Sequence, residues 1–390
     1  MSRFDKKLER RGTDCMKWDV VDKAFEAEDV LPMWVADMDF ETPKAVTDAI
    51  IRRATHGAFG YNVVPQSYYD ALINWMKRRH GWDVKKEWIA YTPGVIPALY
   101  WSVGAFTKPG EKVLVQSPVY YVFYNAISVW EREAVCNQLV RTDEGYRIDF
   151  DDLEQKLSDP LVTMMIFCSP HNPVGRVWTR EELEKVSALC VKHHVLLVSD
   201  EIHSDLVYRG HKHIPVASIN EEAANNTILC VAPSKTFNLA GMCTANVIIP
   251  NKEIYDKLCA ERRKSAIHTP DIFGMTALEA AYDHGEEWLE DLIDYLQDNY
   301  DYLEKWLAEN LPMVKPLRPE GTYLIWLDFS ALNMSKDELK TFLNTKARVA
   351  MDQGCWFGAG GEGFARMNIA CHRSTLQEGL ERIKKAIDAL

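Results

Sequence analysis

The stretch Thr227-Ile-Leu-Cys-Val231, followed by Ala232-Pro233-Ser234-Lys235-Thr236-Phe237, places a lysine just after an apolar run of strand length. A buried strand end is unfavourable for an ammonium group unless the amine is bonded to a ligand. Burial lowers the pKa of such an amine toward its neutral, nucleophilic form, which can form a Schiff base with an aldehyde. Taken alone, Lys235 is more simply interpreted as a lysine that extends to solvent. Three other segments change that interpretation.

A second apolar run, Val195-Leu-Leu-Val-Ser-Asp200, ends in a carboxylate. Ligands bind at the carboxyl ends of strands in open parallel α/β sheets, so the pattern predicts Asp200 at a ligand site. A carboxylate there suits pyridoxal 5'-phosphate (PLP), because it pairs with the pyridinium nitrogen and keeps the ring able to accept electrons. The alternative is that Asp200 caps the N-terminus of a helix.

A turn and a helix start supply further donors. Asn172 lies in the turn Ser169-Pro-His-Asn172-Pro173-Val-Gly175 after the apolar residues 162–167, where it can donate to the ring phenolate oxygen. Gly94 begins an apolar helical pattern that runs to about residue 106, and the free N–H groups of a helix start suit a phosphate. Each feature is weak evidence alone, but the four in chain order indicate one cofactor site.

The order of these segments resembles the fold-type I PLP enzymes, the aspartate aminotransferase superfamily, over essentially the whole chain. Within it, the sequence is most similar to the cystathionine β-lyase-like carbon–sulfur lyases, the branch of MalY, PatB and cystalysin. The resemblance implies an α/β, aspartate aminotransferase-like fold with a large, mostly parallel-sheet PLP domain and a smaller α+β domain. The motifs of the branch are Gly12-Thr13, Lys17-Trp18-Asp19, Trp34-Val-Ala36-Asp37-Met38-Asp39-Phe40, Ser117-Pro-Val-Tyr120-Tyr121-Val-Phe123, Ser169-Pro-His-Asn-Pro-Val-Gly-Arg-Val-Trp178, Asp200-Glu-Ile-His203, Ser234-Lys-Thr-Phe-Asn238, Gly321-Thr-Tyr-Leu and Gly363-Phe364-Ala-Arg366-Met-Asn368.

The resemblance assigns the cofactor contacts residue by residue. Lys235 would form the Schiff base and, once released by the substrate, would take the Cα proton. Asp200 would pair with the pyridinium nitrogen, Asn172 with the ring oxygen, and Tyr120 would stack on the ring. The residues expected to hold the phosphate are Ser234, the backbone of Gly94, Val95 and Ile96, and Tyr61 of a neighbouring subunit in a homodimer with shared active sites.

The resemblance also implies the substrate contacts. Arg366 would bind the α-carboxylate of an amino-acid substrate bidentately, a geometry that arginine satisfies and lysine does not. Tyr121 would assist proton transfer. Ala36 and Asp37 would line the site, although Asp37 and Asp39 could instead cap the next helix along the chain.

Two positions depart from the usual aminotransferase pattern. Many aminotransferases have a phosphate-binding arginine eight residues after the Schiff-base lysine, where this chain has Cys243. His203 stands where aminotransferases often have a tyrosine to the ring oxygen; it could donate that hydrogen bond or pack behind the site. Both departures recur in the lyase branch and therefore favour a lyase.

The activity implied by the resemblance is α,β-elimination on cysteine-type thioethers, giving pyruvate, ammonia and a thiol or sulfide. A thiolate leaves readily because its thiol has a pKa of only ~8.5. The alternative is an aminotransferase of the same fold, which shares the loss of the Cα proton to the electron sink. A third hypothesis is a regulatory binding protein, as a second role beside the lyase activity.

Composition excludes some classes of partner. The 390 residues are 47% hydrophobic and carry a net charge of −12, which opposes binding to nucleic acid or an anionic membrane. We see no secretory apolar region at the start and no apolar run that approaches ~18 residues, so we expect a cytoplasmic protein. The nine cysteines form no C-x-x-C pair and predict reduced thiols, and no metal site is expected.

Alternating helical patterns and short apolar strands predict the domain organisation. We expect an N-terminal arm over residues 1–41 that belongs to the small domain, a large PLP-binding domain over residues 42–285 and a C-terminal small domain over residues 286–390. Strands are predicted at residues 112–116, 162–167, 195–200, 227–231, 245–249, 323–327 and 364–368.

Overall fold

Seven strands form the larger sheet of the computed structural model, which describes residues 2–143 and 145–390. β10 runs antiparallel to its two neighbours, and the remaining neighbours are parallel, so the predicted mostly parallel sheet is confirmed. In spatial order the strands are β2 (Ile89–Thr92), β10 (Ala245–Ile248), β9 (Thr227–Val231), β8 (Leu196–Asp200), β7 (Val162–Cys168), β3 (Lys112–Val115) and β4 (Glu133–Cys136).

Both faces of this sheet are buried, which explains the unbroken apolar runs. Along β7, Met164 and Ile166 pack in one core with α5 (Val95–Phe106) and α11 (Lys252–Lys264). The alternate residues Met165 and Phe167 belong to the opposite core. That second core also takes residues of α4 (Gln66–His80), α8 (Arg180–Lys192) and α12 (Ile272–His284). Other helices around this sheet are α3 (Lys44–Thr55), α6 (Val122–Ser128), α7 (Phe150–Leu157), α9 (Glu221–Asn225) and α10 (Pro233–Thr236).

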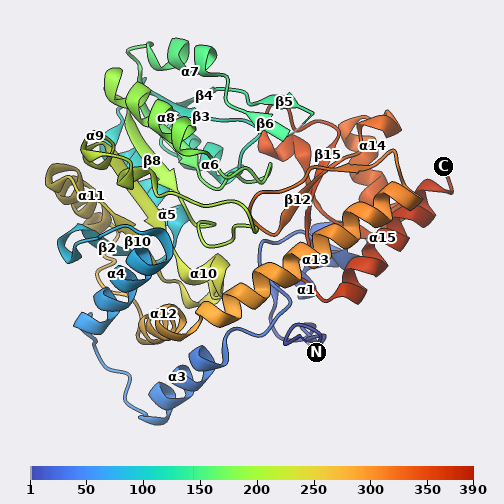
Figure 1. The fold of residues 1–390 in the computed structure, drawn as a ribbon, viewed down its shortest axis with the longest axis horizontal. Coiled ribbons are helices and arrows are strands. Elements are labelled where there is room, and N and C mark those ends of the chain that lie inside the picture. The colour runs from blue at the N-terminus through green and yellow to red at the C-terminus, as the bar shows by residue number, and fades with distance from the viewer. Residues whose placement is uncertain (1, 144) are drawn as a thin grey trace.

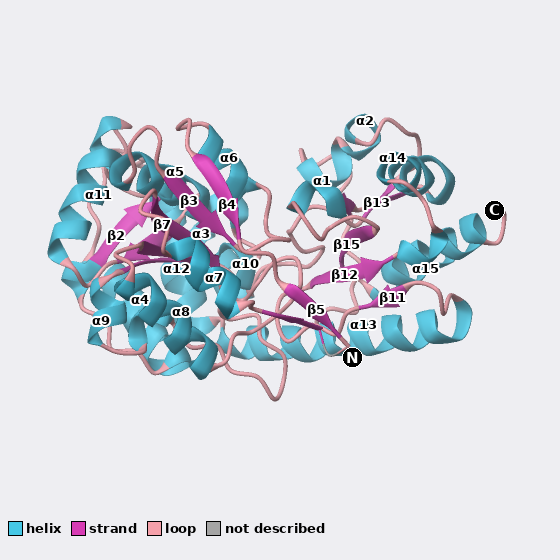
Figure 2. Ribbon diagram, turned by 90° about the horizontal axis from the view of Figure 1, so that it is seen from above, coloured by secondary structure: helices cyan, strands magenta, loops and turns pink. Residues whose placement is uncertain are grey.

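A smaller, four-stranded antiparallel sheet lies in the other lobe of the molecule (Figure 2). Its order is β11 (Lys315–Pro316), β12 (Leu324–Asp328), β15 (Phe364–Asn368) and β14 (Asp352–Gln353). The long helix α13 (Glu286–Asn310) extends from the larger lobe along the smaller one (Figure 1). The other helices of the smaller lobe include α14 (Lys336–Thr341) and α15 (Arg373–Ile387).

The N-terminal arm is paired with the C-terminal part of the chain. β1 (Leu31–Pro32) runs parallel to β13 (Val349–Ala350), and the short helices α1 (Met16–Asp19) and α2 (Val21–Ala24) lie in the smaller lobe (Figure 2). This pairing supports our proposal that the arm belongs to the small domain, with domain boundaries near residues 41 and 285. Among the described residues, no helix combines the length and apolar character needed to cross a membrane.

Candidate active site

A cavity of about 280 Å³ lies at the carboxyl ends of the central strands. Ten residues singled out from the sequence line it: Ala36, Gly94, Val95, Ile96, Tyr120, Asn172, Asp200, His203, Ser234 and Lys235. Six further residues complete the lining: Pro93, Pro97, Cys168, Ile202, Ala240 and Thr244. None of these six was singled out from the sequence, because proline, apolar and small residues of these types occur throughout the chain.

The topology explains why distant residues meet here. Asp200 is the last residue of β8, Asn172 follows β7, and Lys235 lies in α10 directly after β9. These three strands are parallel neighbours, so their carboxyl ends share one edge of the sheet. The chain after Asp200 continues into turns, so the alternative that Asp200 caps a helix is wrong.

The half-buried side chain of Lys235 brings its amine to this cavity. Its Nζ donates to the carbonyl oxygen of Ala36 at 2.7 Å. Burial, followed by the positive charge of Arg366, lowers the pKa of Lys235 to about 8, against the opposing effect of the Asp37 and Asp200 carboxylates. At pH 7 about a tenth of the amine is therefore neutral and nucleophilic, far more than for an ordinary lysine.

Asp200 and His203 line the same cavity, and their pKa values are shifted in opposite directions. Burial raises the pKa of Asp200 to about 7, although the amide of Ile202 donates to its Oδ1 at 3.1 Å. Burial, then the charges of Lys235 and Arg366, lowers the pKa of His203 to about 3, so this imidazole is neutral. Its buried Nδ1 has no hydrogen-bond partner among the described residues.

Tyr120 and Tyr121 precede α6 and lie against each other, with ring centroids 5.0 Å apart. The amide of Tyr120 donates to the carbonyl oxygen of Asn172 at 3.1 Å, which ties this turn to the cavity wall. Burial raises the pKa of both phenols, so both are protonated at neutral pH. Tyr120 lines the cavity, whereas Tyr121 is not part of the lining and has its ring edge-on to Phe357, with centroids 6.2 Å apart.

Arg366 reaches the cavity wall from the smaller sheet. Its Nη1 donates to Asn172 Oδ1 at 3.0 Å and its Nη2 to the carbonyl oxygen of Trp34 at 3.2 Å. The guanidinium also pairs with the buried carboxylate of Asp352, which lies directly opposite it in the neighbouring strand β14. Asp352 was missed from the sequence, because β14 has only two residues and no recognisable pattern. The buried Nε of Arg366 has no partner among the described residues.

Asp37 and Tyr61, like Tyr121 and Arg366, are predicted site residues that are not part of the cavity lining. Asp37 pairs with Arg10, Nη2 to Oδ2 at 2.9 Å. Neither Asp37 nor Asp39 caps α3, whose N-cap is Pro43 and has no side-chain cap, so that alternative is wrong. Tyr61 is fully exposed and lies apart from the cavity.

The cavity residues fit PLP. A buried carboxylate with a raised pKa suits a cationic pyridinium nitrogen, and the unpartnered Nδ1 of His203 and the side chain of Asn172 suit polar atoms of the ring. The N-terminus of α5 and Ser234 face the cavity, and backbone N–H groups of a helix start suit a phosphate. Lys235 supplies the amine that an aldehyde requires.

The fold and site define a fold-type I enzyme of the kind that binds PLP, and comparison with known proteins agrees. Residues 28–383 match the family model for aminotransferases of class I and II, so the chain belongs to that family. It is 48% identical to cystathionine beta-lyase PatB of Bacillus subtilis (strain 168) over 98% of this chain and 99% of PatB. It is 34% identical to protein MalY of Escherichia coli (strain K12) over the full length of both.

The structure is also similar to a solved relative. Cystalysin from Treponema denticola, whose crystal structure contains a pyridoxal 5'-phosphate cofactor, superposes with a TM-score of 0.97 at 38% identity, covering 100% of this chain and 99% of cystalysin. The resemblance predicted from the sequence motifs is therefore confirmed.

Proposed function

We propose that this protein is a PLP-dependent carbon–sulfur β-lyase that acts on cysteine-type thioethers such as cystathionine, or on cysteine itself. The observation that carries the proposal is the amine of Lys235, which has a lowered pKa and shares one cavity with Asp200 in a chain 48% identical to a cystathionine beta-lyase. When bound, PLP supplies an electron sink for the carbanion that forms at the substrate Cα.

The residues of the chain supply binding and proton transfer. The raised pKa of Asp200 suits a carboxyl that becomes an anion when a cationic ring nitrogen lies beside it. Lys235, with its lowered pKa, is the base that takes the Cα proton. Arg366 binds the substrate α-carboxylate; its unpartnered Nε is one donor for it. The protonated phenol of Tyr121 is suited to deliver a proton to the leaving thiolate.

We further propose that two copies share their active sites and that the protein works in the cytoplasm. The fully exposed Tyr61 supports the first proposal, because it stands beside Phe59 and Val63, which are also exposed apolar residues. Such a group is typical of a surface that another chain covers. In this arrangement Tyr61 contacts the phosphate bound by the neighbouring copy.

An absorbance spectrum and a product assay test the proposal, with wild type beside Lys235→Ala. Wild type is expected to acquire the visible absorbance of PLP bonded to a protein amine, and Lys235→Ala is not. Wild type is also expected to release pyruvate from cystathionine or cysteine without any keto-acid acceptor. Turnover that requires a keto acid would identify an aminotransferase instead, and no visible absorbance after addition of PLP would refute both activities.

A further inference from the structure

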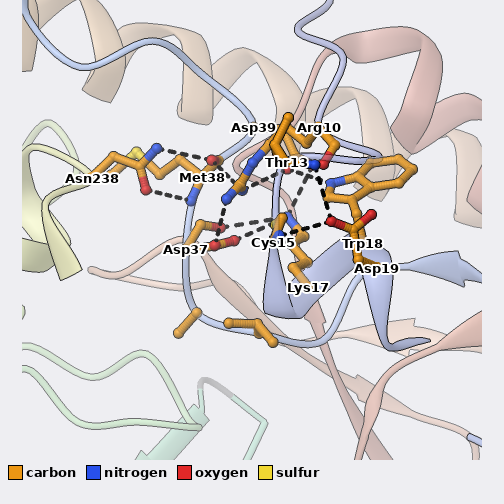
Figure 3. Close-up of polar contacts among 12 residues, drawn as sticks. Arg10, Thr13, Cys15, Lys17, Trp18, Asp19, Asp37, Met38, Asp39 and Asn238 are labelled. Atoms are coloured by element: carbon orange, nitrogen blue, oxygen red, sulfur yellow. Dashed lines mark hydrogen bonds and ion pairs between the residues drawn. The ribbon is translucent and has the colours of Figure 1, made fainter. Parts of the chain in front are cut away.

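Four charged residues of the N-terminal arm, two cations and two carboxylates, pair with one another (Figure 3). Lys17 Nζ lies 2.9 Å from Asp39 Oδ2 and 3.7 Å from Asp37 Oδ1. Arg10 contacts the same two carboxylates, at 2.9 Å to Asp37 Oδ2 and 3.1 Å to Asp39 Oδ1. We call Arg10, Lys17, Asp37 and Asp39 the four-charge cluster; its charges sum to zero.

Lys17 is the unusual member of the cluster, because its side chain is 0% exposed. Burial alone would lower the pKa of Lys17, but the carboxylates of Asp39 and Asp37 outweigh it and raise that pKa, so Lys17 is an ammonium. A fully buried ammonium that is not part of the proposed chemistry needs another explanation. The carboxylate partners of Lys17 suggest one, because Asp37 and Asp39 closely follow Ala36, whose carbonyl oxygen accepts from Lys235.

The turn in question is centred on Ala36. The amide of Asp37 donates to the carbonyl oxygen of Val35 at 2.9 Å, which turns the chain tightly around Ala36. The carbonyl oxygen of Ala36 then accepts from Lys235 Nζ at 2.7 Å and from the Tyr323 hydroxyl at 2.9 Å. The amine of Lys235 therefore rests on a backbone oxygen whose next residue is a member of the four-charge cluster.

Two asparagine side chains also form hydrogen bonds with the backbone of this turn and of the residue after it. Asn238, three residues after Lys235, exchanges two hydrogen bonds with the backbone of Met38, and Figure 3 shows it across Met38 from Arg10. Asn368 donates to the carbonyl oxygens of Val35 and Asp37. The turn is thus tied to the segment of Lys235 and to the strand of Arg366, and the four-charge cluster completes its support.

We propose that the four-charge cluster positions the amine of Lys235, and that Lys17 is the member that keeps the cluster electrically neutral. With Lys17 in place, Lys235 meets a fixed carbonyl oxygen beside a balanced set of charges. Without the ammonium, a net negative charge would remain next to the amine and would favour its protonated, unreactive form. This inference rests on the proposed function, because it assumes that Lys235 is the amine that bonds to PLP.

The other titratable groups around Lys235 would not cancel a net charge left on the four-charge cluster. Arg366 from β15 and Asp200 from β8 face the amine with opposite charges. His203, in the turn after β8, is neutral, and burial raises the pKa of Tyr323, which keeps its hydroxyl protonated. Above the pKa of Asp200, about 7, these groups keep constant charges, so a change in the charge of the four-charge cluster then acts on Lys235 without a compensating change among them.

The test measures how fast PLP is captured by the full-length protein after its cofactor has been removed, as a function of pH. The visible absorbance of PLP bonded to the protein reports capture, and the pH midpoint of the rate reports the protonation of Lys235. Lys17→Met should move this midpoint up by about one pH unit, because a negative charge is left uncompensated. Asp39→Asn should move it down, because a positive charge is then in excess.

The double variant Lys17→Met/Asp39→Asn restores neutrality and should return the midpoint to that of wild type. A purely structural role for Lys17 predicts no shifts of opposite sign and no such restoration. Lys6→Met is the matched control, because Lys6 pairs with Glu41 at 2.6 Å while its side chain is 71% exposed, and its midpoint should equal that of wild type.

The pH midpoints of these variants either support or refute the role proposed for the four-charge cluster. Equal midpoints in wild type, Lys17→Met and Asp39→Asn would overturn it, as would a double variant that keeps the shift of Lys17→Met. If Lys17→Met does not fold, the downward shift of Asp39→Asn decides alone. Capture of PLP by wild type without these shifts refutes only the role of the cluster, whereas no capture by wild type refutes the proposed function.

Discussion

Asp200→Asn should stabilise the PLP-free protein and weaken its hold on the cofactor. Burial raises the pKa of Asp200 from 3.8 to about 7. The folded protein therefore keeps this proton over a pH range in which the unfolded chain has lost it. Ionisation costs the folded state free energy, and this cost is absent below the unfolded pKa and complete above the folded one. An asparagine cannot ionise, so the cost disappears in the variant.

The size of the effect follows from the difference between the two pKa values. Roughly 3 units at 1.36 kcal/mol each give about 4 kcal/mol as an upper value. The buried amide of asparagine offsets part of this gain, so we expect a stabilisation of about 2 to 4 kcal/mol near pH 8. Near pH 5 only about a third of the cost is present, so the advantage of the variant should grow by about 3 kcal/mol between these two pH values.

Urea unfolding of both PLP-free proteins at the two pH values measures this difference, and Asp48→Asn provides the control. Asp48 has an exposed partner, Lys44, and is itself 42% exposed, so its substitution should add no growth with pH. Saturation with PLP should then stabilise wild type more than Asp200→Asn, because a neutral amide cannot pair with a cationic ring. A stability difference that is independent of pH would refute the assignment of the raised pKa to Asp200.

Three further outcomes are expected. The rate at which the PLP-free wild type captures PLP should rise with pH and level off above about 8, the pKa of Lys235, whereas an ordinary lysine would give a rate still rising at pH 10. Tyr61→Phe should speed the release of PLP measured by dialysis, and an unchanged release rate would remove Tyr61 from the site. Gly274→Ala should destabilise the protein by about 1 to 3 kcal/mol in thermal unfolding, because the added Cβ would lie 2.0 Å from Thr244 Oγ1; Gly241→Ala, whose Cβ would meet nothing within 4 Å, should leave stability nearly unchanged.

The central strands and the site at their ends could be predicted because one pattern encodes both. A parallel strand that is buried on both faces is an unbroken apolar run, and the first polar residue after it lies at the ligand-binding edge. Asp200 and Lys235 follow this rule, and the predicted strand bounds agree with β8 and β9 to within one residue.

The strands at the two sides of the same sheet were not predicted. β4 begins with an exposed glutamate, and its other residues are only half-buried, so the sequence shows no apolar run there. β2 has four residues, and it lies directly before the helical pattern that dominates this stretch of sequence. Short strands whose burial depends on a single neighbour leave too weak a pattern to separate them from loops.

The ion pairs of Asp37 and Asp39 could not be predicted from the sequence for a different reason. Asp37 and Asp39 stand a few residues before a helix, which is where capping carboxylates also occur. Their actual partners, Arg10 and Lys17, come from an earlier part of the N-terminal arm, and this arm is also held by long-range contacts such as the pairing of β1 with β13. Arg366 could be predicted from its motif, whereas its partner Asp352 depends on the same kind of long-range strand pairing.

The short turn around Ala36 links the part of the site that comes from the larger lobe to the part that comes from the smaller lobe. Lys235 follows a strand of the larger sheet and Arg366 lies in the smaller one. Two backbone carbonyl oxygens that are two residues apart accept from them: that of Ala36 from the lysine amine and that of Trp34 from the guanidinium. The distance between the group that would take the Cα proton and the group that would bind the α-carboxylate therefore depends on the conformation of this turn. Since effective catalysis needs such groups held in a narrow range of geometry, the buried charges that support the turn influence the chemistry without touching the substrate.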